Sequence, residues 1–145
     1  MGVFCATGHK SCHIIRVSNH GGRQLDGTEG TADALGPVCR AVEAWNRGNP
    51  LGQRCEVYVD GAVRRGKDVF RALALGARAV FVGRPFLFGL AVGGEDGARR
   101  VLDCLREELL STMQLAGVQN CGEITPAHVT KKGGGSIADS DRGRL

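Results

Sequence analysis

The sequence predicts an α/β fold in which helices cover a parallel sheet. A β-branched or apolar run, a glycine-containing turn and a segment with helical periodicity follow one another three times along the chain. The strand-like runs are continuously apolar instead of alternating, which is typical of strands buried on both faces of a parallel sheet. In such folds the binding residues gather at the carboxyl ends of the strands, so we expect the functional residues in the turns that follow the strands.

The first unit begins with a short strand over 14–17, followed by the turn SNHGGRQ and a helix over 32–45. Four apolar side chains recur in that helix at helical spacing and predict its buried face: Leu35, Val38, Val42 and Trp45. We expect residues 46–52 to break the helix.

The second unit has a strand over 55–59, the turn DGAVRRG, and a helix from Lys67 to Leu75 that stops at Gly76. An acidic residue, Asp68, near the start of that helix suits the positive end of the helix dipole.

The third unit has a strand over 79–82, the turn GRP, a short apolar helix through Leu90 and a longer helix over 95–115. The longer helix carries an apolar stripe, which predicts packing in the core and not a cofactor site. The stripe consists of Val101, Leu105, Leu109 and Met113.

Composition sets limits on the class of protein. The chain has 145 residues, enough for one domain, with 42% hydrophobic residues and 23 glycines, which indicate many tight turns. The net charge is only +4 and the basic residues are scattered, so a nucleic-acid groove or other nucleic-acid partner is disfavoured. No apolar run is long enough to span a membrane and no secretory signal is present, so we expect a soluble intracellular protein.

Cysteine spacing favours free thiols over disulfides and metal. The six cysteines are widely spaced, without a CxxC pair: Cys5, Cys12, Cys39, Cys55, Cys104 and Cys121. His9, Cys12 and His13 lie close together, but no second ligand pair stands at the spacing of a zinc finger, so no metal site is expected.

The turn after the first strand carries the residues most suited to chemistry. Arg23 offers a planar set of donors that matches a carboxylate, and His20 can accept a hydroxyl proton at neutral pH. This pair suits the oxidation of a 2-hydroxy acid. The alternative is a solvated loop without a catalytic role, and residue type and spacing alone leave both interpretations open.

The next two turns resemble each other and suit a phosphate. Gly61 permits close backbone approach, Arg64 can bind an anion, and amides near Lys67 open a helix there. Gly83 and Arg84 place a glycine and an arginine in the turn after the next strand as well. Because (β/α)8 barrels make a phosphate site after their last two strands, the two turns together suit a phosphate. Taken singly, each pair also fits a plain tight turn.

Three segments together resemble the carboxyl-terminal part of an FMN-dependent 2-hydroxy-acid oxidase of the glycolate oxidase family. They are VSNHGGRQLDG at 17–27, VYVDGAVRRGKDVFRALALGARAVFVGRPFLFGLA at 57–91 and GEDGARRVLDCLREELLSTMQLAG at 94–117. The resemblance implies the last three βα units of a (β/α)8 TIM barrel. It divides the chain into an unmatched segment 1–16 and a partial FMN-dependent hydroxy-acid dehydrogenase domain 17–130. The segment 131–145 is glycine-rich and charged, so we expect a disordered tail there.

The resemblance implies FMN as cofactor and oxidation of an (S)-2-hydroxy acid to a 2-oxo acid, with O2 reduced to H2O2. His20 falls on the catalytic base and substrate contact, Arg23 on the residue that binds the substrate carboxylate, and Ser18 on a flavin contact. Seven further residues fall on cofactor-binding segments: Asp60, Gly61, Ala62, Val63, Arg64, Gly83 and Arg84.

The resemblance also implies a homo-oligomer in the full-length form and a peroxisomal location. The final residues, 143–145, read Gly-Arg-Leu, a poor peroxisomal signal, and the other expectation is the cytoplasm.

Two residues and one absence depart from the family pattern. Ala62 stands where a second glycine is usual, with a cost if that position needs positive φ. Arg16 stands where the family prefers an apolar residue, and it shares strand parity with Ser18 and His20, so we expect it to face the barrel interior, where an unpaired charge is costly. The first five units of a barrel are not in the sequence. An alternative hypothesis is therefore a non-catalytic remnant or pseudoenzyme that associates with full-length subunits.

Overall fold

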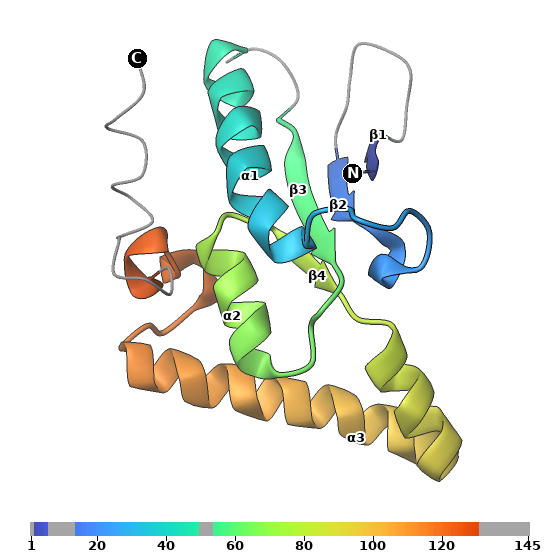
Figure 1. The fold of residues 1–145 in the computed structure, drawn as a ribbon. Helices are drawn as coiled ribbons and strands as arrows, with labels where there is room; N and C mark the ends of the chain where they lie inside the picture. The colour runs from blue at the N-terminus through green and yellow to red at the C-terminus, as the bar shows by residue number, and fades with distance from the viewer. Residues whose placement is uncertain (1, 6–13, 50–53, 131–145) are drawn as a thin grey trace.

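A four-stranded sheet with helices packed on it forms the described part of the chain (Figure 1). The computed structural model describes residues 2–5, 14–49 and 54–130. Strands β2 (Ile14–Ser18), β3 (Glu56–Asp60) and β4 (Ala79–Phe81) are parallel neighbours, which confirms the predicted α/β class with a parallel sheet. The tail over 131–145, predicted to be disordered, lies outside the described residues.

The expectation of a purely parallel sheet is wrong at one edge. Strand β1 (Gly2–Cys5) pairs with β2 in antiparallel orientation, with Gly2 opposite Ser18 and Cys5 opposite Ile15. It was not predicted, because a four-residue run carries too little periodicity to distinguish a strand from a loop.

Two helices cover one face of the sheet. Helix α1 (Thr31–Gly48) packs on β2 and β3, and α2 (Gly66–Ala74) packs on β4. Helix α1 runs through Asn46 to Gly48, so the predicted break starts later than expected. Three short 3-10 turns complete the described elements: His20–Gly22, Cys121–Glu123 and Pro126–His128.

The alternation of side chains along the strands gives the sheet two different faces. Val17, Val57 and Val59 point toward α1 and are buried. Each such side chain stabilises the fold by roughly 1.5–3 kcal/mol. Leu35 and Val42 of the predicted helical stripe join them, whereas the predicted core residue Trp45 is 44% exposed at the far end of α1.

The opposite face carries the other residues of the same strands. Arg16, Tyr58, Asp60 and Phe81 belong to this set, because their neighbours in the strands face the helices. Within the described chain, the main helix contacts of β2, β3 and β4 are with α1 and α2, on the face that carries Val17, Val57 and Val59. We call the opposite face, which carries Arg16, Tyr58, Asp60 and Phe81, the open face.

Helix α3 (Arg84–Ala116) is two helices joined at a bend, as the sequence predicted (Figure 1). Gly93 and Gly94 leave helical geometry there, and the first segment folds back along the second. Gly89 and Gly97 make this possible, because a Cβ on either would lie 2.6 Å or less from backbone of the other segment.

The long segment of α3 packs against α2 and closes a second core. In the predicted stripe Leu105 and Met113 are buried, with Leu109 partly buried beside them. Phe70 of α2 lies in the same cluster. No helix within the described ranges is both long and apolar enough to cross a membrane. Four described cysteines form no disulfide: Cys39, Cys55, Cys104 and Cys121.

Candidate functional site

The turns that follow β2, β3 and β4 line one cavity of about 730 Å³. It lies at the carboxyl ends of these parallel strands, where α/β folds bind ligands. Nine of the ten residues singled out from the sequence line it: His20, Arg23, Asp60, Gly61, Ala62, Val63, Arg64, Gly83 and Arg84. The tenth, Ser18, does not; its hydroxyl accepts a hydrogen bond from the His20 amide at 3.1 Å.

The cavity also contains residues that sequence reasoning did not assign to the site. Arg16, Phe81, Leu87 and Phe88 are among its lining. Strand parity already placed Arg16 on the same face as Ser18, and the same argument applied to the third strand would have found Phe81. The two residues of α3 had no such signal, because helical spacing alone does not show which elements lie beside the first segment of α3.

Hydrogen bonds within the first turn hold His20 in an unusual backbone conformation. The Asn19 side chain accepts a hydrogen bond from the Gly22 amide at 3.2 Å, and His20 has a φ of +56°. In the described structure neither the His20 imidazole nor the Arg23 guanidinium has a side-chain partner, and both residues are exposed. A proton acceptor and a carboxylate-binding fork therefore stand in one turn, both available to a ligand.

The second turn contains two consecutive residues with positive φ. Gly61 has a φ of +91°, and a Cβ there would lie 2.9 Å from Oγ1 of the buried Thr31. Ala62 has a φ of +59°, so the methyl group does impose the strain that the sequence predicted for a positive-φ position.

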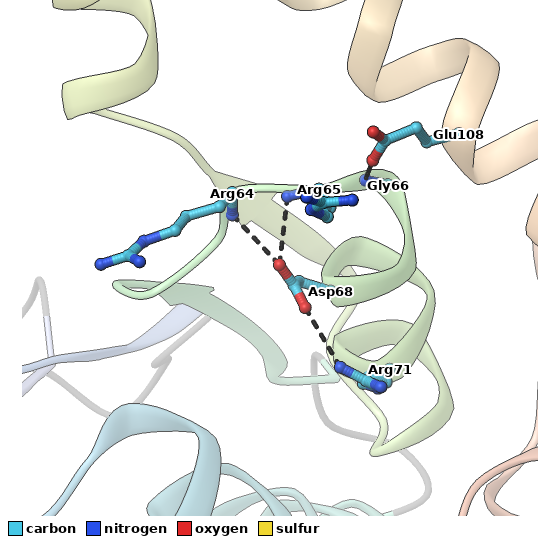
Figure 2. Close-up of polar contacts among 6 residues, drawn as sticks. All are labelled: Arg64, Arg65, Gly66, Asp68, Arg71 and Glu108. Carbon is cyan, nitrogen blue, oxygen red and sulfur yellow. Dashed lines mark hydrogen bonds and ion pairs between the residues drawn. The ribbon is translucent and has the colours of Figure 1, made fainter.

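The amides that open α2 are already satisfied by carboxylates (Figure 2). Asp68 accepts hydrogen bonds from the amides of Arg64 and Arg65 at 3.2 and 3.1 Å. Glu108 of α3 accepts one from the Gly66 amide at 2.7 Å. The expectation that amides near the start of this helix face a phosphate is therefore wrong for these three. The Arg64 guanidinium extends away from Asp68 in Figure 2, and Arg64 lines the cavity.

The third turn is joined to the first. Nη2 of Arg84 donates a hydrogen bond to the carbonyl oxygen of Gly21 at 3.3 Å. Gly83 caps the amino terminus of α3. Arg84 therefore has a donor engaged with the His20 turn and further donors that face the cavity.

The charge of Arg16 is paired in the structure. Its Nε donates to Oδ2 of Asp60 at 2.8 Å, and Nη2 contacts the same oxygen. The guanidinium also lies 5.4 Å from the centre of the Phe81 ring, within the range of a cation-π contact. The sequence indicated the correct face for Arg16 but not the partner, which lies 44 residues away.

Sequence comparison matches residues 6–131 to the family described as FMN-dependent dehydrogenase. 2-Hydroxyacid oxidase 2 of Mus musculus is 52% identical over 117 residues, which are 79% of this chain and 31% of that protein. Glycolate oxidase 3 of Oryza sativa subsp. indica is 51% identical over 128 residues, covering 88% of this chain and 30% of that protein. The chain thus spans about three-tenths of the length of the curated relatives it matches.

Solved structures agree with the sequence matches. A crystal structure of a mandelate oxidase variant is 47% identical, with a TM-score of 0.68 over 77% of this chain and 31% of that one. A flavocytochrome b2 variant with sulfite bound is 38% identical, with a TM-score of 0.74 over 81% of this chain and 29% of that one. A further mandelate oxidase structure contains a monooxide FMN adduct.

Proposed function

Because this chain belongs to the FMN-dependent dehydrogenase family, we propose that it forms the last three βα units of a (β/α)8 barrel that oxidises (S)-2-hydroxy acids. The product is a 2-oxo acid, and O2 is reduced to H2O2. The observation that carries the proposal is the shared cavity, in which His20 and Arg23 face the same space as Arg64 and Arg84. Relatives named as 2-hydroxyacid and glycolate oxidases support the reaction class.

The residues present fit FMN, the cofactor of this family. A cavity of about 730 Å³ is within the size range of small-molecule sites. Arg64 and Arg84 would hold the phosphate, because guanidinium groups bind phosphate oxygens in a bidentate manner. The turn Asp60 to Val63 would hold the ribityl chain, with Gly61 allowing close backbone approach. When bound, FMN supplies a two-electron acceptor that O2 can reoxidise.

Arg23 and His20 have different roles toward the substrate. Arg23 binds the carboxylate through two parallel hydrogen bonds, which fixes the position of the neighbouring carbon. His20 takes the proton of the 2-hydroxyl group while the hydrogen on that carbon leaves with its electron pair. The substrate loses two protons and two electrons in total, and O2 gains the same number to become H2O2. The Ser18 hydroxyl supports His20 through its backbone amide.

The open face supports the incomplete-barrel part of the proposal. Phe81 on the open face is 46% exposed, Phe88 of α3 is 67% exposed, and both line the cavity. In a closed barrel the remaining strands would cover this surface and pair with the free edge of β4. The contribution of this chain is then the His20 turn and the phosphate end of the site.

Flavin retention and peroxide production test the proposal. The chain is purified with added FMN and passed through gel filtration, and peroxide release is then measured with glycolate and longer 2-hydroxy acids. We expect bound yellow flavin, and a loss of about 10²–10⁴ in turnover for His20→Gln with flavin retained. His128→Gln is the matched control, because His128 does not line the cavity; it caps a 3-10 turn with Thr125 and packs edge-on against Phe70. Full activity in His20→Gln would contradict the proposal, and colourless protein would favour the non-catalytic alternative for the isolated chain.

The proposal extends to a peroxisomal location and a homo-oligomeric full-length form. One relative, from Oryza sativa subsp. japonica, is named a peroxisomal (S)-2-hydroxy-acid oxidase and is 53% identical over 119 residues. A fluorescent fusion that stays in the cytosol would contradict the location, and a monomer in analytical ultracentrifugation would contradict the assembly.

A further inference from the structure

The charges that line the cavity are strongly unequal. Of the described residues in its lining, four are arginines, whereas Asp60 is the acidic one. A bare carboxylate at the end of β3 would repel an anionic ligand. The structure places that carboxylate against Arg16 on the neighbouring strand.

We propose that Arg16 is a positioning residue for the phosphate end of the site, and that it acts by neutralising and fixing Asp60. The inference rests on the proposed function, because FMN is the ligand considered. It concerns a residue that departs from the family pattern, so the family's site residues do not contain it.

The contact geometry explains how Arg16 both neutralises and fixes Asp60. Nε and Nη2 of Arg16 both contact Oδ2, so the pair cancels the charge through one oxygen. Oδ1 has no hydrogen-bond donor among the described residues, so Arg16 alone compensates the charge of this carboxylate there. The Asp60 side chain is only 15% exposed, which makes an uncompensated charge there costly.

Two aromatic rings support this arrangement from β4 and β3. The Arg16 guanidinium lies 5.4 Å from the Phe81 ring centre, and Tyr58 packs against the same ring at 5.9 Å between centroids. Three neighbouring strands therefore fix the orientation of the guanidinium. A side chain held in this way is already oriented before a ligand arrives, so less entropy is lost on binding.

Arg16 could instead act as a direct contact to the phosphate, and the two roles predict different results. If Arg16 acts through Asp60, replacing both residues removes the unmasked charge and restores binding. If Arg16 touches the ligand, removing Asp60 as well does not replace the lost contact.

The experiment compares FMN with riboflavin, which lacks the phosphate, in wild type, Arg16→Ile, Asp60→Asn and the double variant. Flavin fluorescence quenching gives the affinities, and calorimetry with inorganic phosphate gives an independent reading. We expect Arg16→Ile to weaken FMN about fivefold, the order of effect of one unmasked charge on a phosphate at a solvent-like dielectric. Riboflavin affinity should change less than about twofold, and the double variant should recover the FMN-to-riboflavin ratio.

Arg78→Ile is the matched control. Arg78 pairs with Glu56 at 3.5 Å at the other end of β3, and it does not line this cavity. We expect FMN binding by this variant to equal that of wild type. Circular dichroism spectra and thermal midpoints of all variants establish that the fold is retained.

The outcomes separate this inference from the proposed function. Phosphate binding that depends on Arg16 without flavin binding supports the inference and contradicts the proposed function for this chain. Equal weakening of FMN and riboflavin, an unchanged FMN affinity in Arg16→Ile, or no recovery in the double variant overturns the inference. Folded wild-type protein that binds neither phosphate nor FMN overturns both.

Discussion

Gly66→Ala should separate α2 from α3 and destabilise the chain. Gly66 is buried at the start of α2, where α3 crosses it. An added Cβ would lie 2.2 Å from the Leu109 amide nitrogen, 2.5 Å from the Leu105 carbonyl oxygen and 2.6 Å from the Glu108 carbonyl carbon. All three are backbone atoms of one helix, so no side-chain rotation can relieve the overlap.

The expected cost is at the upper end of the range for overpacking. Adding a methyl group to a packed interior costs typically about 1–3 kcal/mol. Here α3 as a whole must move, and the Gly66 amide then loses its 2.7 Å hydrogen bond to Glu108. The smaller entropy of the unfolded alanine chain returns about 0.4–1 kcal/mol. We expect a net loss of about 3 kcal/mol in the free energy of unfolding.

Urea unfolding monitored by circular dichroism measures this loss. With a slope of about 1–3 kcal/mol per molar urea, the midpoint should fall by about 1 M or more. Gly48→Ala is the matched control, because Gly48 ends α1 with no atom within 4 Å of an added Cβ. If the two variants differ by less than about 0.5 kcal/mol, the close packing of α3 on Gly66 is refuted.

Three further changes test other parts of the structure. Glu108→Ala leaves a part-buried amide of α2 unpaired and should cost about 1 kcal/mol in urea unfolding, whereas Glu107→Ala, which removes only an exposed ion pair, should cost less than about 0.5 kcal/mol. Ala62→Gly should stabilise the chain by about 0.5 kcal/mol in the same assay by relieving positive φ, and a loss of stability would contradict the strain. Burial raises the pKa of the Cys39 thiol from 9.0 to about 12, so iodoacetamide at pH 8.5 should modify exposed Cys104 and spare Cys39. The raised pKa favours the neutral thiol in the folded state, so stability should fall as pH rises from 9 to 12, and a slope unchanged in Cys39→Ala would contradict this.

Local patterns were sufficient to predict most helices and strands. The helical spacing of Leu35 and Val42 arises from burial against one neighbouring layer, which leaves a period in the sequence. Trp45 follows the same helical spacing but is exposed at the end of α1, so the pattern overestimated the length of the buried stripe. The residues of the three turns could be assigned to one site because parallel strands end on one side of the sheet.

Pairings between distant residues could not be predicted in the same way. Arg16 and Asp60 are 44 residues apart, and Gly66 and Glu108 are 42 apart. Strand parity predicts the face of a charged side chain but carries no information about the residue opposite it. Likewise, the start of α2 looked free to bind an anion because nothing in the local sequence shows that α3 crosses it.

The hydrogen bond from Arg84 to the Gly21 carbonyl has a consequence for protein engineering. It joins two turns that are 63 residues apart, one next to the expected cofactor phosphate and the other carrying the expected base. A library that randomises Arg84 to change cofactor preference would also disturb the support of His20, so improved cofactor variants would be lost through impaired turnover. Libraries that vary the His20 turn and the Arg84 turn together would avoid that loss.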